Sequence, residues 1–399
     1  MTATDTGSVG TEVGRRFPAM DGLRALAASG VLLVHVALIS GYAFRQRDGI
    51  GPYLARAELG VALFFLISGF LLYRPFVGAA YDDRPGPDLR RYARRRLLRI
   101  VPAYWVALTV LAVVLDVRDR HDISSLRDVV VYYGFLQVYF EDTALGGIQQ
   151  AWSLCAEMAF YVSLPGWAWL LRRAGAAARG ADRPNRRLAV ELGALAALYA
   201  FGLAYRWVCV RNAGLATESL ELRVNWLPAN VDLFALGMAV AVLQVHATRW
   251  PSGGAGRVAA AAARVGGWWW LGAAVSYWLV AEHAGLSVGV GADTPAQWMR
   301  RQVLYGTTAL CLLLPAAFGD PDRGLVRRLL RSAPVAAVGL VSYGVFLWHE
   351  GVLDLYRTHE GYVPFAGPFL PQLVVTVVGT AVAAVASWYA VEKPALRHK

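Results

Sequence analysis

The sequence has few charged residues for its length. Asp, Glu, Lys and Arg together make up 17% of the 399 residues, whereas 57% are hydrophobic. A soluble globule of this size needs more polar surface than this composition supplies, so a water-soluble fold is excluded. We therefore expect an integral membrane protein whose solvent is lipid.

Cysteine is also scarce. Cys155, Cys209 and Cys311 lie in or beside apolar segments without paired or CxxC spacing, which excludes a disulfide framework and a zinc site. No metal is predicted. The net charge of +11 would favour nucleic-acid binding if it lay on one soluble domain. The arginines instead form short runs between apolar stretches, as in membrane-protein loops, so no nucleic-acid partner is predicted.

What the sequence does contain is a series of long apolar runs. A helix needs about 20 residues to cross a hydrocarbon core of roughly 30 Å. Ten runs approach that length, near 22–43, 59–78, 100–117, 150–171, 188–207, 226–246, 265–282, 301–318, 334–353 and 368–390. The stretch 129–140 is too short to span comfortably, and we expect it to be interfacial or re-entrant.

The loop charges support the same count. Lys and Arg accumulate in cytoplasmic loops. Every even-numbered connection is basic, namely 74–99, 172–187, 249–264, 323–331 and the C-terminal 393–399, whereas the odd-numbered ones are mixed or acidic. The sequence thus predicts an all-α, polytopic bundle of about ten transmembrane helices, multi-pass in the cell (inner) membrane, with both termini cytoplasmic.

The chain divides into one large domain and two short tails. Residues 1–17 are mostly polar, lack the features of a cleavable signal, and are expected to form a disordered cytoplasmic tail. Residues 18–394 form the transmembrane domain, and residues 395–399 form a short C-terminal tail. The sequence does not indicate an oligomeric state.

The first apolar run carries ionisable residues that are costly in lipid. A charged side chain at mid-bilayer costs about 2.5–3.5 kcal/mol on insertion scales, so such residues are candidates for function. Arg24 and His35 are eleven residues apart, which puts them near one face of a helix, separated by roughly 16 Å. One face therefore offers an anion-binding cation and a titratable imidazole suited to general-base work. A structural histidine is the alternative.

Further polar residues are expected toward the outer side. Trp152 and Glu157 open the fourth run, Asp232 lies in the sixth, and His349 with Glu350 ends the ninth. Each alone is readily explained as an interfacial residue. Together they indicate a polar site in one leaflet.

The third run begins with two arginines one helical turn apart. Arg96 and Arg99 have the ordinary interpretation of a topogenic basic loop, but at a membrane entrance they also form a clamp for phosphates. Gly69 is expected to serve close helix packing. Ser68, which precedes it, lacks the turn that surrounds a hydrolase nucleophile and is weak as a nucleophile candidate.

Taken in order, these motifs resemble the acyltransferase 3 family of membrane O-acyltransferases, which includes polysaccharide O-acetylases and macrolide O-acylases. The resemblance rests on Arg24 with His35, Phe64 to Phe70, Arg96 with Arg99, Trp152 to Glu157 with Phe160-Tyr161, Ser342-Tyr343 to His349, and Glu392-Lys393-Pro394. It covers the membrane region from the first run to the last. Met158 and Phe346 depart from the family pattern, in which an acidic residue and a Tyr are common.

The resemblance implies transfer of an acyl group, usually acetyl, from acyl-CoA to a hydroxyl of a carbohydrate, glycolipid or glycosylated natural product such as a macrolide. Arg24, Arg96 and Arg99 would hold the CoA phosphates. His35 would act as general base or acyl carrier, with Glu157 orienting it. Asp232 and His349 are substitutes for Glu157, and Ser68, Trp152 and Ser342 are supporting residues.

Two other functions remain open on the sequence. A proton-coupled transporter or flippase could use the same buried charges, although paired repeats and matching broken helices are not evident. A haem protein could use His35 and His349 as axial ligands. The sequence does not identify the acceptor, the acyl chain length or the side of product release.

Overall fold

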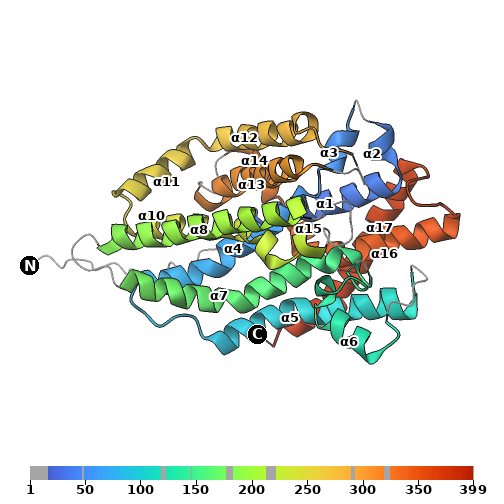
Figure 1. Cartoon of the computed structure of the whole chain (residues 1–399), viewed down its shortest axis with the longest axis horizontal. Coiled ribbons are helices and arrows are strands. Elements are labelled where there is room, and N and C mark those ends of the chain that lie inside the picture. The colour runs from blue at the N-terminus through green and yellow to red at the C-terminus, as the bar shows by residue number, and fades with distance from the viewer. Residues whose placement is uncertain are drawn as a thin grey trace, which may run out of the picture.

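The structure is a computed structural model, and it describes residues 17–46, 49–117, 123–144, 146–176, 183–212, 222–288, 293–318 and 324–398. Within these ranges the chain is helical and forms no strand, as predicted. Figure 1 shows the long helices running along the long axis of the molecule, with short helices gathered at its ends.

Most of the predicted runs are helices that are long and apolar enough to cross a membrane. In the described part of the chain there are seven: α1 (Ala19–Ile39), α4 (Leu59–Tyr81), α5 (Leu89–Leu108) with a π-helical turn to Val114, α7 (Trp152–Ala176), α8 (Arg183–Asn212), α10 (Val231–Arg249), and α17 (Phe369–Ser387) continued by a π-helical turn (Trp388–Glu392) and α18 (Lys393–Leu396). The bent pair α15 (Ala333–Leu340) and α16 (Ser342–Glu360) raises the number to eight if it counts as one span.

The two remaining predicted runs, 265–282 and 301–318, are also helical. They correspond to α12 (Gly266–Trp278), extended by a π-helical turn (Leu279–His283), and to α13 (Pro295–Phe318). These helices pack against each other, and α13 also packs against α4 and α10. They are not among the eight candidate spans, so a count of ten stays a prediction.

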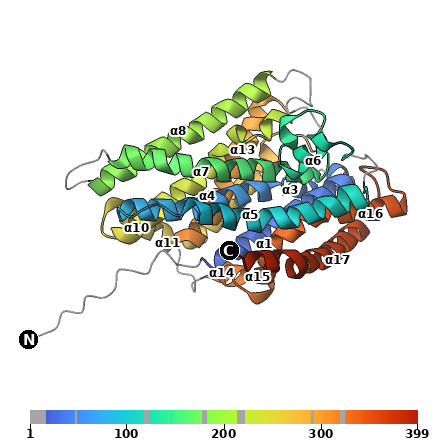
Figure 2. The ribbon, with the colours of Figure 1, turned by 90° about the horizontal axis from the view of Figure 1, so that it is seen from below.

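Burial separates a central layer of helices from a peripheral one. Over an apolar 18-residue stretch of each helix, 78% of the residues are buried in α10 and 67% in α4. The buried share is only 17% in α8 and 22% in α17. Figure 2 shows α8 and α17 at opposite edges, with α4 and α5 between them. The exposed residues of the edge helices include Phe201, Val208, Val378 and Val382, as a lipid-facing surface requires.

Glycines bring the two central helices into backbone contact. A Cβ on Gly69 of α4 would lie 2.3 Å from the carbonyl oxygen of Phe234, and one on Gly237 of α10 would lie 2.1 Å from that of Leu66. Small residues at such crossings allow the close approach on which membrane helix packing depends. The packing role predicted for Gly69 is confirmed, and α4 is held in a fixed position.

The ninth predicted run, 334–353, is not one straight helix. The axes of α15 and α16 differ by 70° at Val341. Ser342 Oγ donates to the carbonyl oxygen of Gly339 at this break (2.8 Å), and a Cβ on Gly339 would lie 2.0 Å from the carbonyl oxygen of Asp21. The bend places the start of α16 beside α1 and inside the bundle.

Short helices cover the two ends of the bundle. The end that carries His35 is covered by α2 (Tyr42–Arg45), α3 (Gly51–Ala55) and α6 (Leu126–Tyr133), which Figure 1 shows together on the right. The predicted stretch 129–140 forms the end of α6 and a 3₁₀ turn (Gln137–Tyr139), each too short to span. The opposite end carries α11 (Gly254–Arg264), on the left in Figure 1, whereas α14 (Leu325–Leu330) packs against α1 nearer the middle.

The predicted N-terminal tail, residues 1–17, lies outside the described residues except for Phe17. The Phe17 ring packs edge-on against Phe70 at 5.1 Å between centroids. At the other end of the chain, the predicted tail 395–399 begins within α18.

We expect Gly237→Ala to lower the thermal stability of the detergent-solubilised protein, because its Cβ would meet the α4 backbone. Such overpacking typically costs about 1–3 kcal/mol. Gly193→Ala on α8 is the matched control, since its Cβ would meet nothing within 4 Å. Equal melting temperatures for the two variants would contradict the close α4–α10 packing.

An ion pair joins α4 and α10 at the end opposite His35. Arg249 Nε and Nη2 donate to the two carboxylate oxygens of Asp82, at 2.7 and 2.8 Å, and Arg84 also bonds this carboxylate. The hydrogen bonds from Arg249, with a smaller contribution from Arg84, lower the pKa of Asp82 from 3.8 to about 2. The ionised form is therefore favoured in the folded state.

Asp82→Asn should lower the melting temperature at pH 6 by an amount that shrinks as the pH falls from 4 toward 2. A depressed folded-state pKa stabilises the fold above the unfolded pKa, and this contribution is lost as the folded carboxyl becomes protonated. Because the pair is partly exposed, we expect less than about 1 kcal/mol. A difference that does not depend on pH would contradict this origin.

Candidate active site

Two cavities inside the bundle contain most of the side chains that the sequence singled out. The larger, which we call the histidine cavity, has a volume of about 1120 Å³ and is lined by His35 and Glu350. The smaller, the arginine cavity, has a volume of about 260 Å³ and is lined by residues Arg24, Ser68, Arg96, Arg99, Glu157 and Ser342. Val61 and Phe65 line both.

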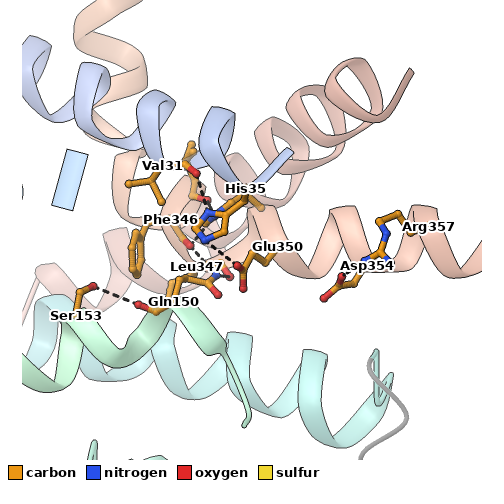
Figure 3. Close-up of polar contacts among 11 residues, drawn as sticks. Val31, His35, Gln150, Ser153, Phe346, Leu347, Glu350, Asp354 and Arg357 are labelled. Atoms are coloured by element: carbon orange, nitrogen blue, oxygen red, sulfur yellow. Dashed lines mark hydrogen bonds and ion pairs between the residues drawn. The ribbon is translucent and has the colours of Figure 1, made fainter. Parts of the chain in front are cut away.

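His35 projects from α1 toward the N-terminal part of α16 (Figure 3). Its Nδ1 lies 2.7 Å from the carbonyl oxygen of Val31 and 3.0 Å from His349 Nε2, and its Nε2 lies 2.9 Å from Glu350 Oε1. The side chain of Glu350 is 5% exposed and that of His35 is 27% exposed. Both ring nitrogens of His35 are therefore engaged, while one edge of the ring faces the cavity.

The carbonyl groups around the two rings determine where the protons lie. His349 Nδ1 faces the carbonyl oxygens of Val345 and Phe346, at 3.0 and 2.8 Å, so it must carry a proton. In the neutral ring its Nε2 is then an acceptor and receives the Nδ1 proton of His35, which Val31 also accepts. Only His35 Nε2 is left to gain or lose a proton.

One proton lies between His35 Nε2 and Glu350. Two bare lone pairs would repel each other at 2.9 Å, so either the imidazole or the carboxyl carries the hydrogen. His35 and Glu350 therefore act as a coupled pair whose protons belong to both groups. Such a pair can accept a proton from a hydroxyl in the cavity only after the shared proton has left.

Gln150, in the 3₁₀ turn (Gln149–Ala151) that leads into α7, contacts the same part of α16. Its Nε2 donates to the carbonyl oxygens of Phe346 and Leu347, at 3.0 and 3.2 Å, and Figure 3 shows it below the His35 ring. These contacts fix the α16 turn that precedes His349 and Glu350. The sequence drew no attention to Gln150, and its only signal is its place two residues before Trp152.

The arginine cavity is an anion-binding environment. Arg24 donates to Asp21 of its own helix at 3.0 Å, while Arg96 and Arg99 reach the cavity from α5. The Nε of Arg96 is buried and has no hydrogen-bond partner among the residues that the structure describes. An unpaired buried guanidinium nitrogen is costly, so this atom is suited to a bound acceptor such as a phosphate oxygen.

Glu157 belongs to the arginine cavity. Its Oε1 accepts hydrogen bonds from Ser68 Oγ and from the Tyr161 hydroxyl, each at 2.6 Å. The carboxylate that contacts the imidazole of His35 is instead Glu350, which the sequence placed at the end of the ninth run without a role. Orientation of His35 by Glu157 stays untested, and the geometry favours Glu350 for it.

The other predicted residues lie around these cavities. Trp152 lines the histidine cavity and packs edge-on against Phe65, at 6.3 Å between ring centroids. Ser342 lines the arginine cavity at the start of α16. Asp232 is buried on α10, where both carboxylate oxygens accept from Gln302 Nε2 (2.8 and 3.0 Å), and it does not line either cavity.

A metal or a haem fits this geometry poorly. One ligand atom from each of His35, His349 and Glu350 lies within 4.8 Å of the others, a spacing that a metal ion accepts. However, His349 Nε2 and His35 Nδ1 lie in hydrogen-bond contact with each other, so a metal ion held by both rings would have to break that contact. Axial haem ligands must lie on opposite faces of a porphyrin, which a 3.0 Å nitrogen–nitrogen contact leaves no room for.

A comparison with known protein families identifies the family of this chain. The acyltransferase 3 model, described as an acyltransferase domain, matches residues 17–390. The chain belongs to the acyltransferase 3 family. The resemblance read from the motifs is confirmed.

Curated relatives carry a consistent name. Over 161 residues, or 38% of this chain, the sequence is 30% identical to a Staphylococcus aureus protein (strain COL) provisionally named O-acetyltransferase SACOL0978. It is 28% identical over a stretch of the same length to O-acetyltransferase OatA of strain NCTC 8325. The match spans 24% of the length of each relative. No solved structure matches this acyltransferase significantly.

We expect Glu350→Gln to reduce acyl transfer by about 10²- to 10³-fold, since the amide cannot stabilise the imidazolium that forms when His35 takes a proton. Glu360→Gln, on the exposed last turn of the same helix, should be indistinguishable from wild type. Both rates would be measured as acetyl-CoA-dependent release of free CoA by protein in liposomes. Near-normal turnover of Glu350→Gln would remove Glu350 from the proton-accepting pair.

Proposed function

We propose that this acyltransferase moves an acyl group, ordinarily acetyl, from acyl-CoA to a hydroxyl of a carbohydrate, glycolipid or glycosylated natural product such as a macrolide. The observation that carries the proposal is the placement of a cluster of cations and a proton acceptor in two cavities that share one wall. The O-acetyltransferase names of the relatives agree with it.

The arginine cavity is the donor site in this proposal. Arg24, Arg96 and Arg99 bind the phosphates of CoA, with the unpaired Arg96 Nε as one contact. The small volume of the cavity, about 260 Å³, suits the slender pantetheine arm better than a bulky molecule. The arm then carries the thioester toward Val61 and Phe65.

The histidine cavity is the acceptor site. Its volume of about 1120 Å³ exceeds that of ordinary small-molecule pockets, which run to about 1000 Å³, and so allows a large glycosylated acceptor. Trp152, Trp298 and Tyr305 offer aromatic faces to sugar rings. Glu58, which accepts from the Tyr305 hydroxyl at 2.9 Å, and Arg301 offer hydrogen bonds to sugar hydroxyls.

The chemistry follows from the His35–Glu350 pair. The shared proton first passes to water, and an acceptor hydroxyl then takes its place and donates to His35 Nε2. The hydroxyl oxygen attacks the thioester carbonyl, the ester forms as the carbon–sulfur bond breaks, and the proton passes from the imidazolium to the CoA thiolate. Glu350 stabilises the imidazolium, and Val31 and His349 hold the ring in one tautomer.

The proposed topology has ten spans, with both termini in the cytoplasm and the protein in the inner membrane. The basic connections support it, as does the packing of α13 against the central helices α4 and α10 and of α12 against α13. Arg24, Arg96 and Arg99 then face the compartment that contains acyl-CoA. His35 lies closer to the outer side, where a surface glycan is accessible.

The test uses purified protein in liposomes with [¹⁴C]acetyl-CoA and a panel of hydroxyl acceptors, including N-acetylglucosamine, methyl glucoside and a macrolide. We expect His35→Ala to lose more than about 10³-fold of acetyl transfer while the protein stays inserted, because His35 Nε2 is the proposed acceptor of the hydroxyl proton. Near-normal turnover of His35→Ala would remove the mechanism. Flux of an acceptor across the bilayer without consumption of acetyl-CoA would favour a transporter instead.

The same assay examines the donor site. Arg99→Ala should raise the KM for acetyl-CoA by about 10- to 100-fold with a smaller change in kcat, because a lost phosphate contact is a binding contact. Arg95→Ala, which is exposed on the same helix and outside the cavity lining, is the control. Identical KM values for the two variants would contradict the assignment of the arginine cavity to CoA.

A further inference from the structure

The two cavities meet at only one place among their lining residues. His35 and Glu350 line the histidine cavity but not the arginine cavity, and the three arginines show the opposite pattern. Val61 and Phe65, one helical turn apart on α4, line both. These two side chains are therefore the wall that separates the cation cluster from the imidazole.

Neighbouring rings hold the Phe65 side chain in place. Its ring stacks on Phe234 of α10, with centroids 4.6 Å apart, and meets Trp152 of α7 edge-on. Phe234 in turn stacks on Phe160, with centroids 4.1 Å apart. Phe65 is 2% exposed, and α4 is fixed against α10 by backbone contact at Gly69 and Gly237. A displacement of the Phe65 ring would therefore disturb its contacts with rings on α7 and α10.

The acyl group must sit at this wall if the proposed function holds, since the inference rests on it. A donor anchored by arginines on one side and a hydroxyl held at His35 on the other can react only where the two cavities meet. The carbonyl carbon then lies beside Val61 and Phe65. Any further carbons of the acyl chain must find room between the same side chains.

We propose that Phe65, together with Val61, sets the length of the acyl group that the enzyme transfers, admitting acetyl and rejecting longer chains. Phe65 is a specificity-determining residue in this view, because its ring occupies the volume that the third and later carbons of a longer chain would need. A close-packed wall discriminates strongly between chains that differ by a few methylene groups.

The test measures CoA release by the full-length protein in liposomes with acetyl-, butyryl- and hexanoyl-CoA. Wild type should strongly prefer acetyl-CoA. Phe65→Ala, or the milder Phe65→Leu, should raise the butyryl-to-acetyl ratio of kcat/KM at least 10-fold. Phe70→Ala is the matched control, since Phe70 is a fully buried Phe of the same helix that lines neither cavity, and its ratio should stay at the wild-type value.

Substitutions at Val61 test the effect of narrowing and of widening the junction between the cavities. Val61→Phe should fill the junction, so that acetyl transfer falls at least 100-fold while the Kd for acetyl-CoA changes less than 3-fold. Val61→Ala should raise the butyryl-to-acetyl ratio, whereas Val77→Ala, a buried valine of the same helix outside both cavities, should leave it unchanged.

The outcomes separate the inference from the function on which it rests. Normal acetyl turnover with an unchanged chain-length ratio in Phe65→Leu and Val61→Ala would overturn the inference alone. A wild-type protein that neither binds nor consumes acetyl-CoA would overturn the proposed function, and the inference with it. A raised ratio in the Phe65 and Val61 variants, but not in the Phe70 and Val77 controls, would support both.

Discussion

The interaction on which the site depends is the contact of His35 with Glu350 and His349 inside an apolar bundle. An ionisable side chain in lipid is costly unless the protein supplies its partners, and here one proton and a set of carbonyl oxygens satisfy every ring nitrogen. The residues come from α1 and α16, near opposite ends of the chain. The 70° bend between α15 and α16 brings them together, and the contacts of Gln150 with α16 hold them.

The rest of the arrangement is organised by α4. One side of this helix packs closely against α10 through glycines. Another side carries Val61, Phe65 and Ser68, which line the cavities. The same helix therefore anchors the core and forms the wall between two polar spaces. Because its backbone cannot move relative to α10, the positions of the wall side chains are fixed by packing of the core rather than by a loop.

The sequence was most informative where lipid makes a residue type improbable. His35, Arg24, Arg96 and Arg99 stand out because charge is costly there, and the structure does place them in cavities. Which carboxylate contacts His35 could not be predicted, because this depends on how each helix is rotated and on a bend that a hydropathy pattern does not encode. Glu157 and Glu350 were both visible, yet only the fold shows that Glu350 meets His35. The helix positions were predictable, whereas the 70° bend within the predicted run 334–353, where Ser342 bonds the Gly339 carbonyl, was not.

The separation of the two carboxylates has a chemical consequence for the proposed reaction. Glu157 accepts hydrogen bonds from two hydroxyl groups beside the arginines, so its carboxylate already has partners in the cavity of the proposed donor site. Glu350 shares its proton with His35 on the acceptor side. A thioester approaching from the arginine cavity therefore meets no free base until it reaches the wall at Phe65. In the proposed reaction, hydrolysis would require a water molecule activated at His35, which lies on the other side of that wall. The wall therefore separates the carboxylate beside the arginines, Glu157, from the His35–Glu350 pair, and the proposed reaction confines proton acceptance to the cavity in which the acceptor would bind.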